Sequence, residues 1–586
     1  MKELKDYRKY VILAVPLILI VFAAAAYVTS QSHNSDLKRF SSMGEIESYL
    51  KGASGTGSIF YYGTDMPRLK VNTAEVGAND YLTTNIQVAG VDEADIVKSD
   101  GNYIYIASGD TVYIMRTYPP EEAEIVSKIT INNSYSVALY INGDRLVVIG
   151  NGYSVAGLLK RYPISIANSF VKVYDITDRS SPELVRELVT NGTVSGSRMI
   201  GDYVYIVSQK HPYVYDYEGE DYKIELPSYE YGNITKEIAP HEVYYIESEE
   251  TYYYFITVIS LNIADESTPP SDETFLAGAS STMYVSTENM YLVAHRSYPV
   301  RIMIFPPSTS ADDWREETTV YRLGLDDGKI ALEANGKVPG QILNQYSMDE
   351  YNGYFRVATT EWTSNGSENA VYVLNMEMEI VGSLEDVAPG ERIYSARFMG
   401  DRCYLVTFRQ VDPFFVIDLS DPTRPSVLGY LKIPGYSSYL HPIDKDHMIG
   451  LGKEENNLKL SLFNVEDVGA PKEVAKFWLE YAYSDSEALY DPKAFLFDAG
   501  RQILAIPVGW TEQGGAWNQG AFVFNVSTNE GVVLRGTIVH QSGIEGWNLT
   551  IRRILYIEDA IYTVSNDQVW ISDFGTLDLI KTIVLI

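Results

Sequence analysis

The chain has 586 residues, in which 78 acidic and 46 basic side chains leave a formal charge of −32, and Cys403 is the only cysteine. This charge repels nucleic acid and anionic lipid headgroups, and a single cysteine excludes an intrachain disulfide or a cysteine-based metal site. Because the 47 tyrosines and the many β-branched residues favour strands, the composition predicts a large, acidic, all-β protein.

The amino terminus predicts a membrane segment within residues 1–30. Four basic residues between Lys2 and Lys9 precede an apolar run from Val11 to Val28 that contains no charged side chain. At roughly 1.5 Å per helical residue, this run spans about 27 Å, enough for a thin bilayer. We expect the basic flank to stay in the cytoplasm and the rest of the chain to face outward. Alternatively, the small residues Ala23–Ala26 form a signal-peptide cleavage site, and the protein is secreted.

Residues 31–80 read as a stalk between the membrane segment and the main body. Ser42 and Glu45 have the spacing of a helix capping box, so we expect a short helix to begin there. The stretch Gly52–Ser58 contains only small residues and predicts a flexible spacer. This arrangement predicts that the stalk holds the body away from the membrane.

Residues 81–586 show one repeating pattern, in which short alternating strands are separated by tight polar turns. Nine such turns recur, most of them 43 to 64 residues apart, which suits one four-stranded blade each. They fall at Ser99–Asn102, Asn142–Arg145, Gly201–Asp202, Thr287–Asn289, Tyr351–Gly353, Gly400–Arg402, Asp444–His447, Asp498–Arg501 and Glu558–Asp559.

A second marker has an Asp or Asn, then an Asp three residues later and a Pro seven residues later. Its three copies are Asp175/Asp178/Pro182, Asp418/Asp421/Pro425 and Asn464/Asp467/Pro471. We expect the first residue to end a strand, the second to cap the turn, and the proline to precede the next strand. These carboxylates are therefore predicted to be structural turn residues, not a metal or catalytic set.

These repeats predict a β-propeller of eight or nine four-stranded blades, preceded by one transmembrane helix and the short stalk helix. The repeats are too long for β-solenoid coils, and no linkers separate them into independent sandwiches. Nine turns suggest nine blades, whereas eight blades remain if one hairpin is an insertion. The chain ends in the apolar run Lys581–Ile586, which we expect to be a final strand of the ring.

Three stretches carry a resemblance to a known family: Asn85–Gly101, Tyr394–Arg402 and Tyr436–Asp444. The sequence resembles secreted proteins with a C-terminal β-propeller domain that is distantly related to WD-type repeats. The resemblance covers roughly residues 80 to 586 and implies an exported propeller of an archaeon or bacterium. It implies no particular activity.

The acidic cluster Asp92, Glu93 and Asp95 precedes the first blade and is a candidate metal site. Carboxylates at this density could bind Ca²⁺, although a calcium loop usually supplies more oxygen ligands. The alternative is that these residues dock the preceding segment onto the first blade. No motif in the sequence requires a cofactor, so calcium is the one cofactor that the sequence suggests.

Two further groups are candidate binding residues. Tyr436, Tyr439 and His441 open the seventh repeat, where they could line a channel mouth and hold a sugar or a peptide, or else form a packed Tyr–His contact. Tyr213, Tyr215 and Tyr217 belong to an insertion, residues 211–255, that is rich in tyrosine and acid. This insertion forms either an exposed partner surface or an extension of the third blade with tyrosines paired across strands.

The sequence favours a binding role outside the cell over catalysis. The compact signatures of hydrolases, metalloproteases and nucleotide-binding proteins are absent, and Cys403 lies in a strand-like run that predicts a buried, inert thiol. The leading hypothesis is a membrane-anchored, non-catalytic binding or scaffold protein for protein or glycan partners. The alternative is an extracellular enzyme, a hydrolase or a metal-dependent one, with its site in the propeller channel. A further hypothesis is self-association into a surface layer.

Six glycosylation sequons accord weakly with export. They begin at Asn132, Asn191, Asn233, Asn365, Asn525 and Asn548.

Overall fold

The computed structural model describes residues 37–53 and 85–585, except for short segments within the second range. Those segments are 160–161, 217–220, 247–252, 296–315, 364–365, 410–411, 513–514, 516 and 541–549. The expected membrane segment Val11–Val28 and most of the expected spacer therefore lie outside the described residues. Within the part that is described, no helix combines the length and the apolar character needed to cross a membrane.

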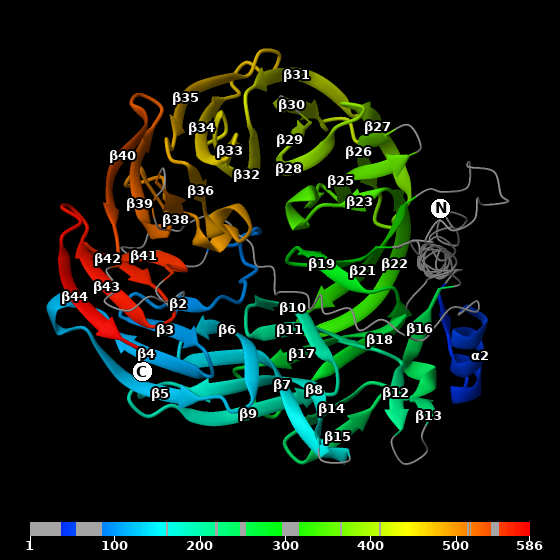
Figure 1. Ribbon diagram of the computed structural model, residues 1–586. Helices are drawn as coiled ribbons and strands as arrows, with labels where there is room; N and C mark the ends of the chain where they lie inside the picture. The colour runs from blue at the N-terminus through cyan, green and yellow to red at the C-terminus, as the bar shows by residue number, and fades with distance from the viewer. Residues whose placement is uncertain are drawn as a thin grey trace, which may run out of the picture.

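Nine sheets of four or more strands follow one another along the described chain and stand side by side in a ring (Figure 1). The first sheet contains β2 (Val97–Ser99), β3 (Tyr103–Ser108), β4 (Thr111–Arg116) and β5 (Glu124–Thr130). The second contains β6 (Ser134–Asn142), β7 (Arg145–Leu159), β8 (Tyr162–Asp175), β9 (Glu183–Thr190), β14 (Ser228–Tyr231) and β15 (Ile234–Glu237). The third contains β10 (Thr193–Ile200), β11 (Tyr203–Lys210), β17 (Tyr254–Asn262), β18 (Ser271–Ala277), β16 (Val243–Tyr245) and β1 (Lys38–Arg39).

The next three sheets continue around the ring in chain order. The fourth contains β19 (Ser280–Val285), β20 (Asn289–His295), β21 (Glu317–Asp326) and β22 (Lys329–Pro339). The fifth contains β23 (Gln341–Ile342), β24 (Met348–Tyr351), β25 (Tyr354–Thr363), β26 (Gly366–Leu374) and β27 (Ile380–Val387). The sixth contains β28 (Arg392–Met399), β29 (Arg402–Phe408), β30 (Asp412–Asp418) and β31 (Ser426–Ile433).

The last three sheets bring the chain back to its start (Figure 1). The seventh contains β32 (Tyr436–Pro442), β33 (His447–Glu454), β34 (Asn457–Asn464) and β35 (Lys472–Trp478). The eighth contains β36 (Tyr483–Asp485), β37 (Leu496–Asp498), β38 (Ile503–Thr511), β39 (Trp517–Ser527) and β40 (Gly531–Ile538). The ninth contains β41 (Arg553–Ile557), β42 (Ala560–Val564), β43 (Gln568–Asp573) and β44 (Leu579–Val584). This radial arrangement is a β-propeller, as the sequence predicted.

The predicted turns are confirmed, because each of the nine joins two antiparallel strands near the inner side of a different sheet. In the fifth and eighth sheets, short 3-10 helices divide the inner strand into two pieces. They are η4 (Gln345–Ser347) between β23 and β24, and η5 (Glu487–Leu489) and η6 (Pro492–Ala494) between β36 and β37.

The turn chemistry of the second marker is also confirmed. Asp175, Asp418 and Asn464 each end a strand. The carboxylates that follow accept backbone N–H bonds: Asp178 from Ser180 at 2.9 Å, Asp421 from Thr423 at 3.0 Å and Asp467 from Gly469 at 3.1 Å. The outer strand then begins just after the proline. These residues therefore act locally, through their own backbone.

Side chains close the ring between the first and ninth sheets. In the described chain, β44 pairs only with β43, so the terminal strand belongs to the last sheet as expected and is not shared with the first. The two sheets instead bury one hydrophobic cluster that includes Ile104, Tyr113, Tyr562 and Ile571. The hydroxyl of Tyr562 also donates to the Thr117 carbonyl at 2.7 Å. The ring closes by packing, not by strand exchange.

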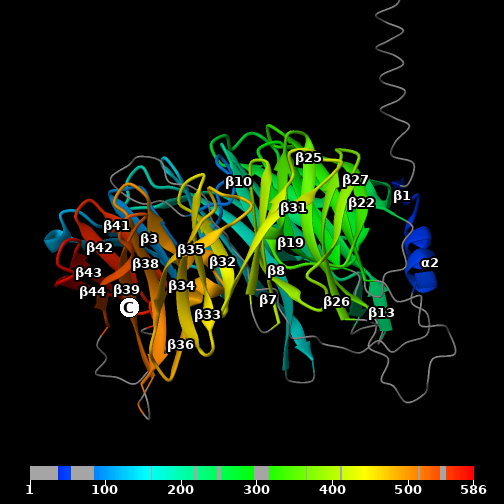
Figure 2. The same ribbon diagram turned by 90° about the horizontal axis from the view of Figure 1, so that it is seen from above.

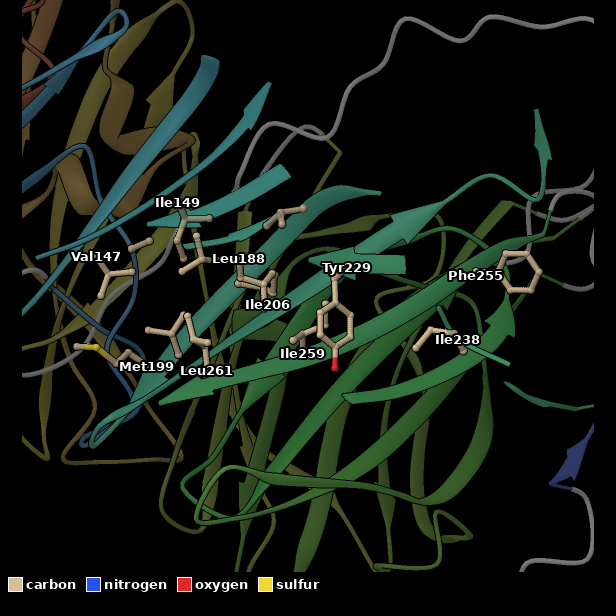
Figure 3. Close-up of a cluster of buried hydrophobic side chains, with 14 of the residues drawn as sticks. Val147, Ile149, Leu188, Met199, Ile206, Tyr229, Ile238, Phe255, Ile259 and Leu261 are labelled. Carbon is tan, nitrogen blue, oxygen red and sulfur yellow. The ribbon is translucent and has the colours of Figure 1, made fainter. Parts of the chain in front are cut away.

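Every described pair of adjacent sheets is joined in a similar way, by the apolar side chains on their facing surfaces. Figure 3 shows the cluster between the second and third sheets, where Val147 and Ile149 of β7 and Leu188 of β9 meet Ile206 of β11 and Ile259 of β17. Buried Cys403 lies in another such cluster, and burial raises the pKa of its thiol to about 12, as expected of an inert cysteine.

The segment before the expected spacer packs on the body, which differs from the expectation of a separate stalk. The helix α2 (Met43–Ala53) lies beside the third sheet at the outer rim (Figures 1 and 2). β1 pairs with β16, and Phe40, Ile46 and Leu50 are buried in the cluster of the second and third sheets. Ile46 and Leu50 lie four residues apart and therefore on one face of α2. An apolar helix face is stable when it packs against another part of the protein, here the propeller.

Local hydrogen bonds start this helix near the predicted residues. The backbone N–H of Glu45 donates to Oγ of Ser42 at 3.3 Å, as the capping box requires. The Glu45 carboxylate accepts from the N–H of Ser41 at 2.6 Å, one residue earlier than predicted. These bonds with Ser41 lower the pKa of Glu45.

The tyrosine-rich insertion extends two sheets. β16 adds to the third sheet, as one of the two hypotheses expected, whereas β14 and β15 add to the outer edge of the second. The remaining strands of the insertion, β12 (Tyr213–Asp216) and β13 (Asp221–Ile224), pair with each other as a hairpin. Tyr229 and Tyr245 are buried, so these strands contribute to the core.

We predict that Ile46→Ala lowers the free energy of unfolding by about 2–4 kcal/mol, because it leaves a cavity where α2 meets the body. Lys51→Ala, on the exposed side of the same helix, should change it by less than about 0.5 kcal/mol. Urea denaturation of the purified full-length protein, followed by circular dichroism, measures both. Equal effects of the two substitutions would show that the helix does not dock in solution.

Candidate functional site

A cavity of about 400 Å³ lies at one mouth of the channel, where the innermost strands begin. Its walls come from the first few residues of β10, β19, β28 and β32, together with η4 and the segment from Leu489 to Pro492. In an antiparallel sheet, the first strand begins at the same end of the sheet at which the second strand ends. The cavity therefore shares a face of the ring with the loops that join second to third strands, the face from which the β7–β8 hairpin projects (Figure 2).

A β-bulge recurs near the start of these inner strands. The pairing skips one residue in β10, β28 and β32: Ser195, Tyr394 and Ser438. All three line the cavity. Because a bulge turns its unpaired residue out of the regular alternation, the bulges explain how these side chains reach the channel.

Aromatic side chains dominate the sixth and seventh sheets at this mouth. The rings of Tyr394 and Tyr436 lie 4.6 Å apart, and both contact Phe408. Deeper in the cavity, Tyr346 and Tyr439 lie 5.6 Å apart. The guanidinium of Arg392 lies 4.7 Å above the Tyr394 ring and donates to its hydroxyl at 2.7 Å. Flat rings with hydrogen-bonding edges suit a ligand that has both apolar and polar faces.

The structure separates the three binding residues suggested for the seventh repeat. Tyr436 and Tyr439 line the cavity. His441 packs behind them, with Nδ1 3.0 Å from the Tyr439 hydroxyl and its ring against Phe495 and Phe497. Burial, aided by the charge of Arg397, lowers the pKa of His441 to about 3, so the ring is neutral near pH 7. His441 thus forms the packed contact, and the two tyrosines face the cavity.

A short piece of the chain itself lies inside the ring, beside the cavity and against the inner strands. This channel segment, residues 85–96, lies on the inner side of the ring before β2 (Figure 1). It forms bridges to the inner strands of two sheets, Asp92 with Met199 and Asp95 with Leu139. The side chain of Gln87 donates to the carbonyls of Gln345 and Met348 at 3.1 and 3.3 Å. Gln345 also lines the cavity, so the channel segment supports the cavity wall.

Buried ion pairs hold the channel segment in place. Asp95 accepts from Nε of Arg553 at 3.0 Å, and Glu93 lies 3.6 Å from Nη2 of Arg198. Asp92 accepts from Nζ of Lys98 at 2.7 Å. Arg553 also pairs with Glu487 and Asp491, which lie at η5 and η6. The carboxylates of the predicted acidic cluster thus each face a cation.

These contacts shift several protonation equilibria. Burial raises the pKa of Asp95, but the charges of Arg553 and Lys493 outweigh it, and the net pKa is lowered. Burial lowers the pKa of Lys493 to about 8, against the opposing charges of Asp95 and Glu93. At Asp491 burial dominates and raises the pKa. Such shifts are typical of a desolvated ion-pair network as well as of active sites.

This placement favours the docking interpretation of Asp92, Glu93 and Asp95 over the calcium site. Among the residues that the structure describes, no three His, Cys, Asp or Glu side chains are arranged to hold a metal ion. The oxygens of Asp92 and Asp95 already accept hydrogen bonds from cations and from backbone N–H groups. Calcium binding there stays a prediction, which a calorimetric titration can address.

The structure describes only part of the suggested partner surface, which consists of Tyr213, Tyr215 and Tyr217. Tyr213 is half-buried and packs against the core of the second and third sheets. Tyr215 pairs with Tyr222 in the hairpin, and Tyr217 lies outside the described residues.

The sequons occupy varied places. Asn132 and Asn233 lie exposed in turns, Asn525 is exposed on β39, and Asn191 bonds to the Leu226 carbonyl through its side chain. Asn365 and Asn548 lie outside the described residues.

Sequence reasoning missed most of the cavity. Arg392, Tyr346 and Tyr490 line it but carry no motif, and they come from three different sheets. The one available signal was the aromatic start of the sixth and seventh inner strands. The interruptions η4, η5 and η6, which bring Gln345, Glu487 and Lys493 to the channel, follow no repeat that the sequence shows.

Residues 81–577 match the family described as the β-propeller domain. An uncharacterized protein of the archaeon Methanocaldococcus jannaschii is 31% identical over 563 residues, which cover 86% of this chain and 83% of that protein. An uncharacterized protein of Archaeoglobus fulgidus is 29% identical, in a match that covers 96% of this chain and 98% of that protein.

The fold comparison with solved structures includes a crystal structure of a eukaryotic initiation factor. It covers 71% of this chain and 91% of the other, with 10% sequence identity and a TM-score of 0.30. At that score, the likeness carries no argument about function.

We predict that Arg553→Met destabilises the protein by about 3–5 kcal/mol, because it leaves the buried carboxylate of Asp95 and the partly buried carboxylate of Asp491 without this cation. The neighbouring Arg552 is a matched control, since in the described chain it forms an ion pair with Glu487 at 2.8 Å and its side chain is about a third exposed. Arg552→Met should cost less than about 1 kcal/mol. Urea unfolding measures both, and a small effect of Arg553→Met would contradict a central role of this network.

Proposed function

The chain belongs to the β-propeller domain family, and from this premise we propose that it is an extracellular, membrane-anchored binding or scaffold protein without catalytic activity. In this proposal each of the nine sheets is one blade. The segment Val11–Val28 anchors the protein, and the propeller presents the channel-mouth cavity to a protein or glycan partner outside the cell.

One observation carries the proposal: the described lining of the cavity offers aromatic rings and neutral hydrogen-bonding groups, without a carboxylate, imidazole, amine or thiol. Among the residues that the structure describes, its lining has tyrosines, small polar residues and apolar residues, with Arg392 as its charged member, and it includes no Asp, Glu, His, Lys or Cys. A general acid, base or nucleophile must reach the substrate directly or through one water. A volume of about 400 Å³ is within the ordinary range for small-ligand sites.

The alternative function, an extracellular enzyme with its site in the channel, has less support. The carboxylates that gather in the channel, Asp95, Glu487 and Asp491, surround Arg553 in buried ion pairs. A carboxylate held in this way cannot exchange protons with a substrate unless the network opens. His441 is neutral and packed behind Tyr439, away from the cavity lining.

We predict that Tyr436→Ala weakens binding of the cognate ligand by about tenfold or more, because an aromatic wall of the cavity is lost. Glycan arrays and peptide libraries, probed with the purified full-length protein, identify ligands in both classes. The matched control is Tyr430→Ala, which removes a tyrosine that is 58% exposed on the outer strand β31. Circular dichroism checks that both variants fold.

If the Tyr436→Ala variant binds every identified glycan and peptide with the same affinity as the parent protein, the cavity is not the binding site. A hydrolytic or other turnover of any bound compound would favour the enzyme instead.

A further inference from the structure

The aromatic surface of the cavity continues beyond it, across the seventh and eighth sheets. Tyr483 begins β36 and Trp517 begins β39, at the edge of the eighth sheet where β38 ends. This is the edge at which Tyr436 begins β32 in the seventh sheet. Tyr394, Tyr436, Tyr490, Tyr483 and Trp517 therefore share one face of the ring, and we name them the aromatic strip.

The members of the strip are linked by direct contacts. The rings of Tyr394 and Tyr436 lie 4.6 Å apart, and those of Tyr483 and Trp517 lie 6.2 Å apart. Lys453, which pairs with Tyr436 across β32 and β33, joins the two halves. Its Nζ lies 4.5 Å above the Tyr483 ring and donates to the Tyr483 hydroxyl at 3.2 Å. The strip is therefore continuous from the cavity outward.

The outer members are unusually exposed for large aromatic side chains. Tyr490 is 71% exposed, Trp517 50% and Tyr483 39%. Exposed apolar surface that is contiguous, rather than scattered, marks an interaction site. Because Tyr490 also lines the cavity, one ligand can contact both the cavity and the strip.

The charges in the outer part of the strip, around Tyr483 and Tyr490, suit a neutral ligand. Asp485 lies 3.0 Å from Nζ of Lys453 and accepts from the Tyr490 hydroxyl at 3.4 Å, so this acid and base neutralise each other. A polyanion would be repelled by a protein of net charge −32, and a polycation would be drawn to the acidic surface elsewhere. What the strip offers is flat rings with hydroxyl and ion-paired groups between them.

The backbone geometry of the innermost strands disfavours the binding of an extended peptide as an added strand along their edges. Such a peptide needs a regular row of free backbone groups. Bulges interrupt that row between Ile393 and Ser395 in β28 and between Ser437 and Tyr439 in β32. The strand β36 is only three residues long. Side-chain rings, not strand edges, are the main feature of this face.

We propose that the aromatic strip and the cavity together bind a neutral polysaccharide chain, with one sugar in the cavity and the following sugars on Tyr483 and Trp517. The C–H face of a pyranose ring is apolar and carries a slight positive charge, so it stacks on the negative face of an aromatic ring. Sugar hydroxyls bond to Arg392, to the tyrosine hydroxyls and to the Lys453–Asp485 pair. This inference rests on the proposed binding function and specifies the ligand.

The test is calorimetric titration of the full-length protein with neutral oligosaccharides of one to six residues. The series are homo-oligomers of glucose, N-acetylglucosamine, galactose and mannose. For one series at least, affinity should rise from the disaccharide to the hexasaccharide. The Trp517→Ala variant should bind the hexasaccharide about fivefold more weakly, so that the gain with length shrinks.

The control is Trp362→Ala. Trp362 is 52% exposed near the end of β25 in the fifth sheet, matching Trp517 in residue type and exposure, and it is not part of the strip. Its removal should leave the affinity for every oligosaccharide unchanged. Circular dichroism again checks the fold of both variants.

An affinity that does not depend on oligosaccharide length, or an equal loss in both tryptophan variants, would overturn the strip while leaving the cavity as a binding site. If the protein binds peptides in a way that depends on Tyr436 and binds no saccharide, the proposal of a polysaccharide ligand is wrong, whereas the proposed binding function is retained. Absence of both would overturn the proposed function as well.

Discussion

Closure of the ring is the constraint on which the rest of this structure depends. Each sheet buries its two faces against its neighbours, so the first and last sheets must meet or leave apolar faces in water. In the described chain they meet through one shared hydrophobic cluster, without a shared strand. Arg553 of the last sheet adds ion pairs to Asp95, 458 residues earlier. The same arginine holds the channel segment, so the closing of the ring and the docking of this segment are coupled.

The distribution of charge follows from this coupling. The surface of the protein is strongly acidic, but the cations Arg553, Arg198, Lys98 and Lys493 are buried beside the channel segment. They balance the carboxylates of that segment and of η5 and η6, where an unpaired buried charge would cost several kcal/mol. These four cations and their carboxylate partners are thus committed to structure. The cavity beside them presents mostly neutral rings, and this lining supports the proposed binding role.

The position of the cavity also follows from backbone geometry. Inner strands begin at one face of the ring, and the bulges near the starts of β10, β28 and β32 turn Ser195, Tyr394 and Ser438 into the channel mouth. In the fifth and eighth sheets, 3-10 helices interrupt the inner strand and bring Gln345 and Leu489 to the same place. Local departures from regular strand pairing therefore shape the site, while the regular strands carry the core.

The amino-acid sequence by itself determined the all-β repeat, the nine turns, the strand ends at Asp175, Asp418 and Asn464, and the terminal strand. Each depends on residues a few positions apart, whose turn chemistry and alternation act locally. Only the tertiary structure decided that Ile46 docks on the body, that Asp95 meets Arg553, and that Tyr346, Tyr394 and Tyr439 share a cavity. Those contacts join residues tens to hundreds of positions apart, and their geometry exists only once the sheets have packed into a ring.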